Sequence, residues 1–182
     1  MSPVVGHLWH LTTRFVGSLS PAAPNEFDET WARSQLTPGE QAVWAAMSNP
    51  DRRHAIEVAR RAVVSLGDRA DRPVVAAALL HDSGKTVSRL GTFARVGATL
   101  LWAVTDDDRA EQWADGPADS MPGRLRRRLG QYRRHPEIGA RLLADAGSDP
   151  LTVAWTAEHH QPAARWSVDP VVADALKLAD DD

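Results

Sequence analysis

The stretch that decides the fold runs from Pro73 to Lys85 and reads PVVAAALLHDSGK. Every residue from Val74 to Leu80 is apolar, so a helix here is buried on all sides, which is typical of the central helix of a bundle. Pro73 suits the first turn of such a helix, and Gly84 breaks it. The helix therefore ends at a polar pair, His81 and Asp82, directly after the most apolar segment of the chain.

Helical patterns flank this segment on both sides. Residues 37–40 (TPGE) have the form of a capping box and predict a helix that continues to about Met47. Residues 51–66 place apolar side chains at helical spacing, and Gly67 supplies a stop. Residues 86–104 are predicted to be helical and mostly apolar, whereas residues 106–122 read as a polar loop with two prolines and a glycine.

The second half of the chain repeats one kind of helix start. Residues 123–134 are predicted to form a strongly basic helix, and in each of three later helices a proline takes the first position after a cap residue, at His135-Pro136, Asp149-Pro150 and Asp169-Pro170. No period-2 strand pattern of useful length occurs. We therefore predict an all-α protein, a single globular helical bundle with about seven to nine helices. Residues 1–49 are expected to form an N-terminal helical extension, and residues 50–182 the main domain.

Composition limits the classes of function. The 182 residues are 43% hydrophobic and 25% charged, with a net charge of -3, so we expect a folded domain without a general attraction to nucleic acid. The longest run without charged residues, 1–13, is too short to cross a membrane, and no basic residue precedes Arg14 as a secretory signal would require. A cytoplasmic location without a membrane partner is expected. The chain has no cysteine, so any metal ligands are histidines and carboxylates.

Five histidines lie at the ends or on the faces of predicted helices beside apolar residues. A buried histidine must satisfy both ring nitrogens, and metal coordination would satisfy several at once. Asp82 ends the most apolar helix, and Asp180 lies in register with the apolar stripe of the last helix. Because an unpaired buried carboxylate is costly, we expect a cation beside both of them. Taken singly, each has a simpler interpretation: an exposed histidine, a helix cap, a surface pair or an acidic tail. The histidines are His54, His81, His135, His159 and His160.

The joint order of these residues resembles the HD-domain superfamily of metal-dependent phosphohydrolases. The matching pieces are Arg53-His54, Leu80-His81-Asp82-Ser83-Gly84-Lys85, His135-Pro136-Glu137-Ile138-Gly139, Glu158-His159-His160-Gln161 and Leu178-Ala179-Asp180. The resemblance implies an HD-type bundle over residues 51–182. It also implies one metal ion held by His54, His81, Asp82 and Asp180, and a second ion that Asp82 shares with His135 and His159. Either His159 or His160 could be the last ligand, because helix register with Leu151 and Trp155 favours the first and register with Val153 and Ala157 the second.

This ligand set points to hydrolysis of phosphate esters. Imidazole and carboxylate ligands without sulfur suit two divalent transition-metal ions; Mn(II) or Fe(II) are favoured, and Co(II), Ni(II) or Zn(II) also fit. Such ions lower the pKa of a bound water to about 7 and supply a nucleophile without Ser or Cys. Lys85 follows the His-Asp pair closely enough to bind a phosphoryl oxygen, unless it is an ordinary exposed lysine.

The expected substrate is a small phosphate ester, either a nucleotide or a related molecule, with Asp82 and Lys85 as catalytic residues and Lys85 also binding substrate. Two other functions stay open: an HD-type di-iron oxygenase, and a non-catalytic, metal-stabilised binding module. The arginines of residues 124–134 fit a solvated helix face; the alternative is a patch that binds a nucleotide polyphosphate or an oligonucleotide. The sequence leaves the oligomeric state open.

Overall fold

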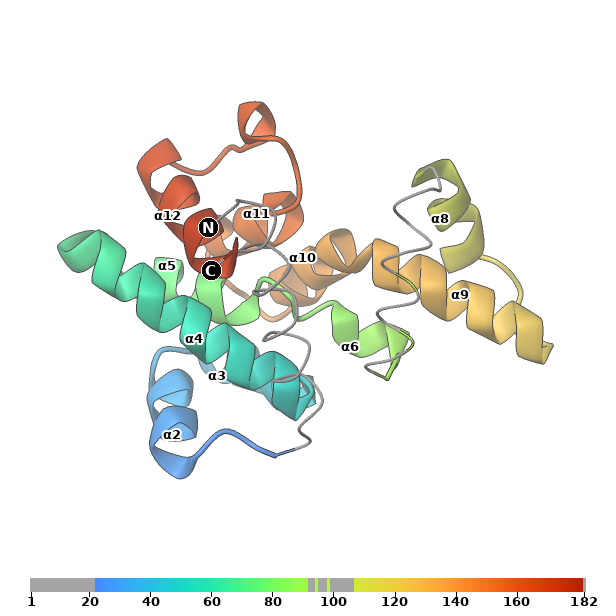
Figure 1. Cartoon of the computed structure of the whole chain (residues 1–182), viewed down its shortest axis with the longest axis horizontal. Helices are drawn as coiled ribbons and strands as arrows, with labels where there is room; N and C mark the ends of the chain where they lie inside the picture. Colours follow the sequence, from blue (N-terminus) through green and yellow to red (C-terminus); the bar gives the residue numbers. More distant parts are fainter. Residues whose placement is uncertain (1–21, 92–93, 95–97, 99–106, 182) are drawn as a thin grey trace, which may run out of the picture.

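The computed structural model describes residues 22–91, 94, 98 and 107–181. Within these residues every regular element is an α-helix or a short 3-10 helix, and no strand occurs among them, which confirms the all-α prediction (Figure 1). The helices are α2 (Glu26–Ser34), α3 (Pro38–Ala46), α4 (Asn49–Leu66), α5 (Arg72–Leu80), α6 (Lys85–Ser88), α8 (Asp107–Ala114), α9 (Met121–Arg133), α10 (His135–Asp145), α11 (Pro150–Glu158) and α12 (Pro170–Asp181). The 3-10 helices are η1 (Gly67–Arg69) and η2 (Ala163–Arg165).

Local sequence explains where most of these helices begin and end. The Thr37 hydroxyl accepts from the Glu40 backbone N–H and the Glu40 carboxylate accepts from that of Thr37, so the predicted capping box starts α3. The carboxylates of Asp71, Asp149 and Asp169 accept from backbone N–H groups in the first turns of α5, α11 and α12 and so act as simple N-caps. α4 ends at Gly67 in a positive-φ conformation (φ 53°), which glycine adopts without strain.

The larger of two hydrophobic cores holds α5 at its centre. Residues 74–80 are all buried, and α4 and α11 pack directly on this helix while α12 packs on α4. We call α2–α5 and α10–α12 the bundle. The core also includes Ala32, Leu36 and Trp44, so the described helices before residue 50 share the core of those after it. Among the described residues no helix is both long and apolar enough to cross a lipid bilayer.

A smaller unit extends to one side of the bundle and comprises α6, α8 and α9; we call it the arm (Figure 1). Its own core consists of Leu90, Ala98 and Ala110, with Trp113, Leu129 and Tyr132 packed against them. The predicted polar loop at 106–122 is therefore wrong in part, because α8 occupies residues 107–114 and packs on α9 through its few apolar side chains. Most of the predicted helix at 86–104 lies outside the described residues, but α6 ends at Ser88, where Arg89 takes a left-handed conformation.

Candidate metal centre

Five helices deliver the predicted ligands to one region of the bundle. His54 lies on α4, Asp180 lies in the last turn of α12, and His135 is the first residue of α10. The remaining ligands come directly after helices α5 and α11 and are His81, Asp82, His159 and His160. Residues that are up to 126 positions apart in the chain thus meet in space.

The first ligand group contains His54, His81 and Asp180, whose donor atoms all lie within 4.8 Å of one another. His54 Nε2 is 3.0 Å from Asp180 Oδ1, and His81 Nε2 is 3.6 Å from the same oxygen. The Asp180 side chain is only 13% exposed, so it is not part of a solvated acidic tail. One carboxylate oxygen therefore faces two imidazoles at distances that a metal ion could bridge.

The second ligand group contains Asp82, His135, His159 and His160, again within 4.8 Å. Asp82 Oδ1 lies 3.1 Å from His135 Nε2 and 3.8 Å from His159 Nε2. The other oxygen, Oδ2, lies 3.6 Å from His81 Nε2 in the first group. Asp82 is therefore the residue that joins the two groups. His159 is buried whereas His160 is exposed, and the structure brings both of these alternatives into the second group.

Three buried histidines carry the clearest sign of a metal site. In His81, His135 and His159, Nδ1 lies 2.8–2.9 Å from the backbone carbonyl oxygen three residues earlier. A carbonyl only accepts, so Nδ1 carries the proton and, in the neutral ring, Nε2 has the lone pair. All three Nε2 atoms are buried and make no hydrogen bond of acceptable geometry. Buried polar atoms without partners are costly, and a cation between Nε2 and the carboxylates would satisfy them.

The electrostatics of the group agree with a site for a cation. Burial would lower the pKa of His81, but the charges of Asp82 and Asp180 outweigh burial and raise this pKa to about 9. Burial lowers the pKa of His159 to about 4, which keeps this imidazole in the neutral form that binds metals. Burial would raise the pKa of Asp82, yet the neighbouring charges of Lys85 and His81 hold it well below its usual range.

Lys85 lies beside the centre, as predicted. Its Nζ donates to Asp82 Oδ2, and the lysine side chain is 18% exposed. Although burial alone would lower the pKa of Lys85, the Asp82 carboxylate raises it above its usual value, so the ammonium stays charged. A simple exposed lysine is therefore excluded, because this ammonium is paired with the carboxylate that joins the two ligand groups.

Close backbone packing sets the spacing between Asp82 and His135. A Cβ on Gly84 would lie 2.6 Å from the backbone nitrogen of Gly139 and still closer to the His135 carbonyl oxygen. Gly84 has an ordinary right-handed conformation (φ -66°), so it is needed for this close approach and not for the turn that its sequence suggests. The start of α6 thus rests on the first turns of α10, which carries His135.

One positioning contact was not visible in the sequence. Arg61 Nε donates to the Ala179 carbonyl oxygen at 2.9 Å and so ties the last turn of α12 to α4. Ala179 precedes Asp180, and α4 carries His54, so this hydrogen bond holds two members of the first ligand group together. The pair Arg61 and Ala179 is 118 residues apart, a separation at which no local pattern could have suggested it.

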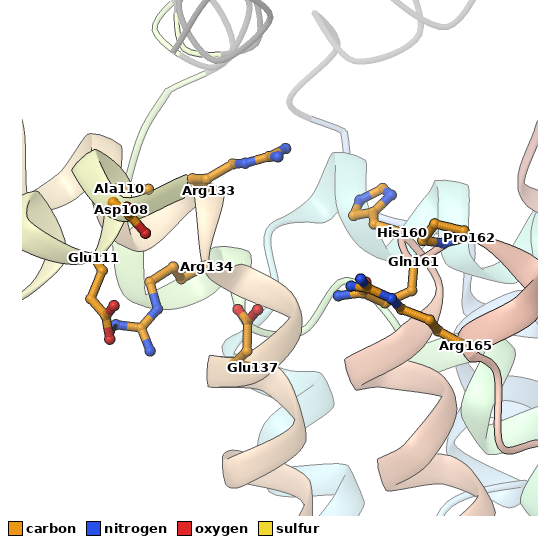
Figure 2. A pocket seen from close by; sticks show the side chains of 10 residues that line it. All are labelled: Asp108, Ala110, Glu111, Arg133, Arg134, Glu137, His160, Gln161, Pro162 and Arg165. Atoms are coloured by element: carbon orange, nitrogen blue, oxygen red, sulfur yellow. Dashed lines mark hydrogen bonds and ion pairs between the residues drawn. The ribbon is translucent and has the colours of Figure 1, made fainter. Parts of the chain in front are cut away.

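A cavity of about 510 Å³ opens next to the second ligand group, and His160 belongs to both (Figure 2). Its lining comes from three directions: from α8 and α9, from the first turns of α10, and from the segment after α11. The lining residues are Asp108, Ala110, Glu111, Arg133, Arg134, Glu137, His160, Gln161, Pro162 and Arg165. Of these, the sequence predicted a site role only for His160 and, as an alternative, a binding role only for the two arginines of the basic cluster.

The basic cluster on α9 divides into different roles. Arg128 donates to the backbone carbonyl oxygens of Ser88 and Arg89 and so joins α9 to the end of α6. Arg124, Arg126 and Arg127 are exposed, in line with a solvated face, whereas Arg133 and Arg134 line the cavity. The exposed arginines thus agree with the solvated face, and the last two arginines of the cluster lie in the cavity wall, where binding of a phosphate compound stays a prediction.

The structure therefore brings the predicted metal ligands together in the bundle with Lys85 of the arm beside them, and the buried His/Asp groups could hold a metal ion. A comparison of the chain with known protein families, with curated proteins and with solved structures found no match.

Proposed function

We propose that the protein is a metal-dependent hydrolase of small phosphate esters, with a nucleotide or a related phosphorylated molecule as substrate. The observation that carries this proposal is the set of three buried imidazoles, each with Nδ1 bonded to a carbonyl and an unpartnered Nε2 aimed at Asp82 or Asp180. The same residue order resembles HD-domain phosphohydrolases, which supports the reaction class by analogy.

The donor set fits two divalent transition-metal ions, one for each ligand group. His54, His81 and Asp180 would hold one ion, and His135 with His159 or His160 the other, with Asp82 shared between them. Nitrogen and oxygen donors without sulfur suit Mn(II) or Fe(II), and also Co(II), Ni(II) or Zn(II). When bound, such ions make a water nucleophilic near neutral pH and polarise the phosphoryl group.

The protein's own side chains contribute orientation and charge. The carbonyl oxygens of Ala78, Tyr132 and Thr156 fix the tautomer and ring direction of His81, His135 and His159, so no reorganisation is needed before binding. The Lys85 ammonium lies against Asp82, where it would meet the nonbridging oxygens of a phosphoryl group placed at that carboxylate. Its positive charge would be most valuable as negative charge builds up in the transition state.

Metal analysis followed by a substrate screen tests the proposal. The metal content of the purified protein would be measured by atomic emission, and the protein loaded with Mn(II) would be screened for phosphate release from nucleotides and simple phosphate esters. We expect bound transition metal and metal-dependent release of phosphate. A protein that binds no divalent metal, or that binds metal but hydrolyses no ester, would overturn the proposal. Oxygen consumption, measured in parallel with iron loaded, would identify an oxygenase in that second case.

A further inference from the structure

We propose that the cavity next to the metal centre selects a phosphorylated sugar or polyol that carries a second anionic group, and that Arg133 and Arg165 bind this group. The inference rests on the proposed function, because it takes the reacting phosphoryl group to lie at Asp82. The volume of about 510 Å³ is in the range of small-molecule sites, and His160 joins the cavity to the ligand group. A substrate could therefore reach from the metal centre into the cavity.

Two walls of the cavity carry cationic side chains. Arg133 comes from the end of α9, and Arg165 from η2 on the other side, and Figure 2 shows both entering the space between the walls. A planar guanidinium can bind a phosphate or carboxylate through two parallel hydrogen bonds. A ligand anion between these arginines would lie some way from the reacting phosphoryl group.

The third arginine of the lining has a different role. Arg134 Nη1 lies 3.8 Å from Glu111 Oε1 and 3.6 Å from Asp115 Oδ2, so carboxylates of α8 and its C-terminal end offset its charge. Within the part of the chain that the structure describes, no carboxylate pairs with Arg165, and its Nη1 donates only weakly, at 3.5 Å, to the side-chain amide oxygen of Gln161 on the same wall. We therefore assign the second anionic group mainly to Arg165.

The segment that carries Arg165 is firmly held. Trp166 Nε1 donates to the carbonyl oxygens of Glu158 and Gln161, at 3.1 and 3.0 Å. The Glu158 carboxylate accepts from both the backbone N–H and the hydroxyl of Ser167, at 2.7 and 2.6 Å. These bonds flank Arg165 on both sides, so little ordering of the backbone would be needed for it to bind a ligand.

The rest of the lining indicates a hydrophilic ligand body. Glu137 lies between the two walls (Figure 2), where its carboxylate could accept hydrogen bonds from hydroxyl groups. The described residues that line the cavity include no Trp, Tyr or Phe, and only Ala110 and Pro162 are apolar. A nucleobase is normally bound by stacking on such rings. Within the substrates of the proposed function, these side chains therefore favour a sugar or polyol over a nucleoside.

Binding and turnover of four probes test the inference on the metal-loaded full chain. The probes are glycerol 1-phosphate with one anionic group, 3-phosphoglycerate and fructose 1,6-bisphosphate with two, and adenosine 5′-monophosphate with a base. Calorimetry would give the Kd of each, and phosphate release would give kcat and KM. Arg165→Gln is the test variant, and Arg127→Gln, an exposed position of α9 that does not line the cavity, is the control for loss of one charge.

We expect the probes with two anionic groups to bind at least tenfold more tightly than the other two. Arg165→Gln should reduce that preference by roughly tenfold to a hundredfold, the effect of losing one charge-assisted contact, and Arg127→Gln should preserve it. Equal affinities for all probes, no binding of any probe, or equal effects of the two substitutions would overturn the inference. Binding that depends on Arg165 but is not followed by phosphate release would contradict the proposed function alone. Phosphate release without a preference for probes with two anionic groups would contradict the inference alone.

Discussion

The bundle and the arm differ in how much core supports them. The bundle buries both Trp44 and Trp155 together with residues 74–80 of α5, whereas the described core of the arm has three buried residues, two of them alanines. Every candidate metal ligand belongs to the bundle, while the arm supplies Lys85 and one wall of the cavity. The unit with the larger described core thus carries the ligands, and the arm holds groups that would contact the substrate.

The largest effect is expected in the bundle, at Asp82. Asp82→Ala removes the carboxylate that lies against both ligand groups, so we expect loss of at least one metal ion and of all measurable turnover. Metal content by atomic emission and phosphate release would be measured together. Asp145→Ala, at an exposed position of α10, is the matched control and should retain both properties. Wild-type metal content and rate in Asp82→Ala would contradict the ligand assignment.

Two core substitutions compare the packing of the bundle and the arm directly. Leu79 is fully buried in α5, and we expect Leu79→Ala to lower the free energy of unfolding by about 2–5 kcal/mol. Leu129 is partly exposed in the core of the arm, so Leu129→Ala should cost on the order of 1 kcal/mol. Urea denaturation measures both. Equal costs would mean that the arm is packed as tightly as the bundle, which would remove the distinction.

Lys85 tests the point at which the arm meets the metal centre. Lys85→Ala should lower kcat/KM for the best phosphate ester by roughly tenfold to a hundredfold, because a contact between charged groups is worth about 1.5–3 kcal/mol. A fall in kcat would indicate a transition-state contact, and a rise in KM would indicate substrate binding. Lys85→Arg should not restore full activity, since a planar guanidinium does not replace a compact ammonium. An unchanged kcat/KM would limit Lys85 to its ion pair with Asp82.

Sequence reasoning located the bundle well and the arm poorly, for a physical reason. Caps and stop signals act within a few residues, so the capping box at Thr37 and the glycine stop at Gly67 could be recognised without knowing the fold. The helix α8 has a polar composition, and it is packed on α9 by few apolar side chains. Its sequence was interpreted as a loop because of this polar composition and the prolines and glycine that follow it, although residues 109–112 (RAEQ) are good helix formers.

The same limit applies to the candidate site. The ligands could be proposed from the sequence because histidines and carboxylates stand out beside apolar residues, and the resemblance supplied their order. The contacts that position them could not, since Gly84 against Gly139 and Arg61 against Ala179 depend on how separate helices pack. The cavity was missed for the same reason: its walls come from helices whose relative placement no local pattern encodes.

The smallest expected effect compares ion pairs in the two units. In the bundle, Glu29 Oε1 accepts from Arg33 Nε, Trp44 Nε1 and Arg52 Nη1 at 2.8–3.1 Å, which links α2 to α3 and α4. Burial alone would raise the pKa of Glu29, but these hydrogen bonds and the arginine charges lower it below its usual value. In the arm, Glu111 is 66% exposed and lies 3.8 Å from Arg134.

The pKa of Glu29 is lower in the folded state than in the unfolded state, where it is near 4.5. The charged carboxylate therefore stabilises the fold fully at pH values above 4.5. This stabilisation is lost as the pH falls through the pKa of the folded state. We therefore expect Glu29→Gln to cost about 1 kcal/mol at pH 7 and progressively less below pH 4.5, whereas Glu111→Gln should have no measurable cost at either pH. Urea denaturation at pH 7 and pH 3.5 measures the difference. If the cost of Glu29→Gln is the same at both pH values, the loss of stability comes from the shape or hydrogen bonding of the introduced glutamine. In that case the charge of Glu29 does not hold α2 against the bundle.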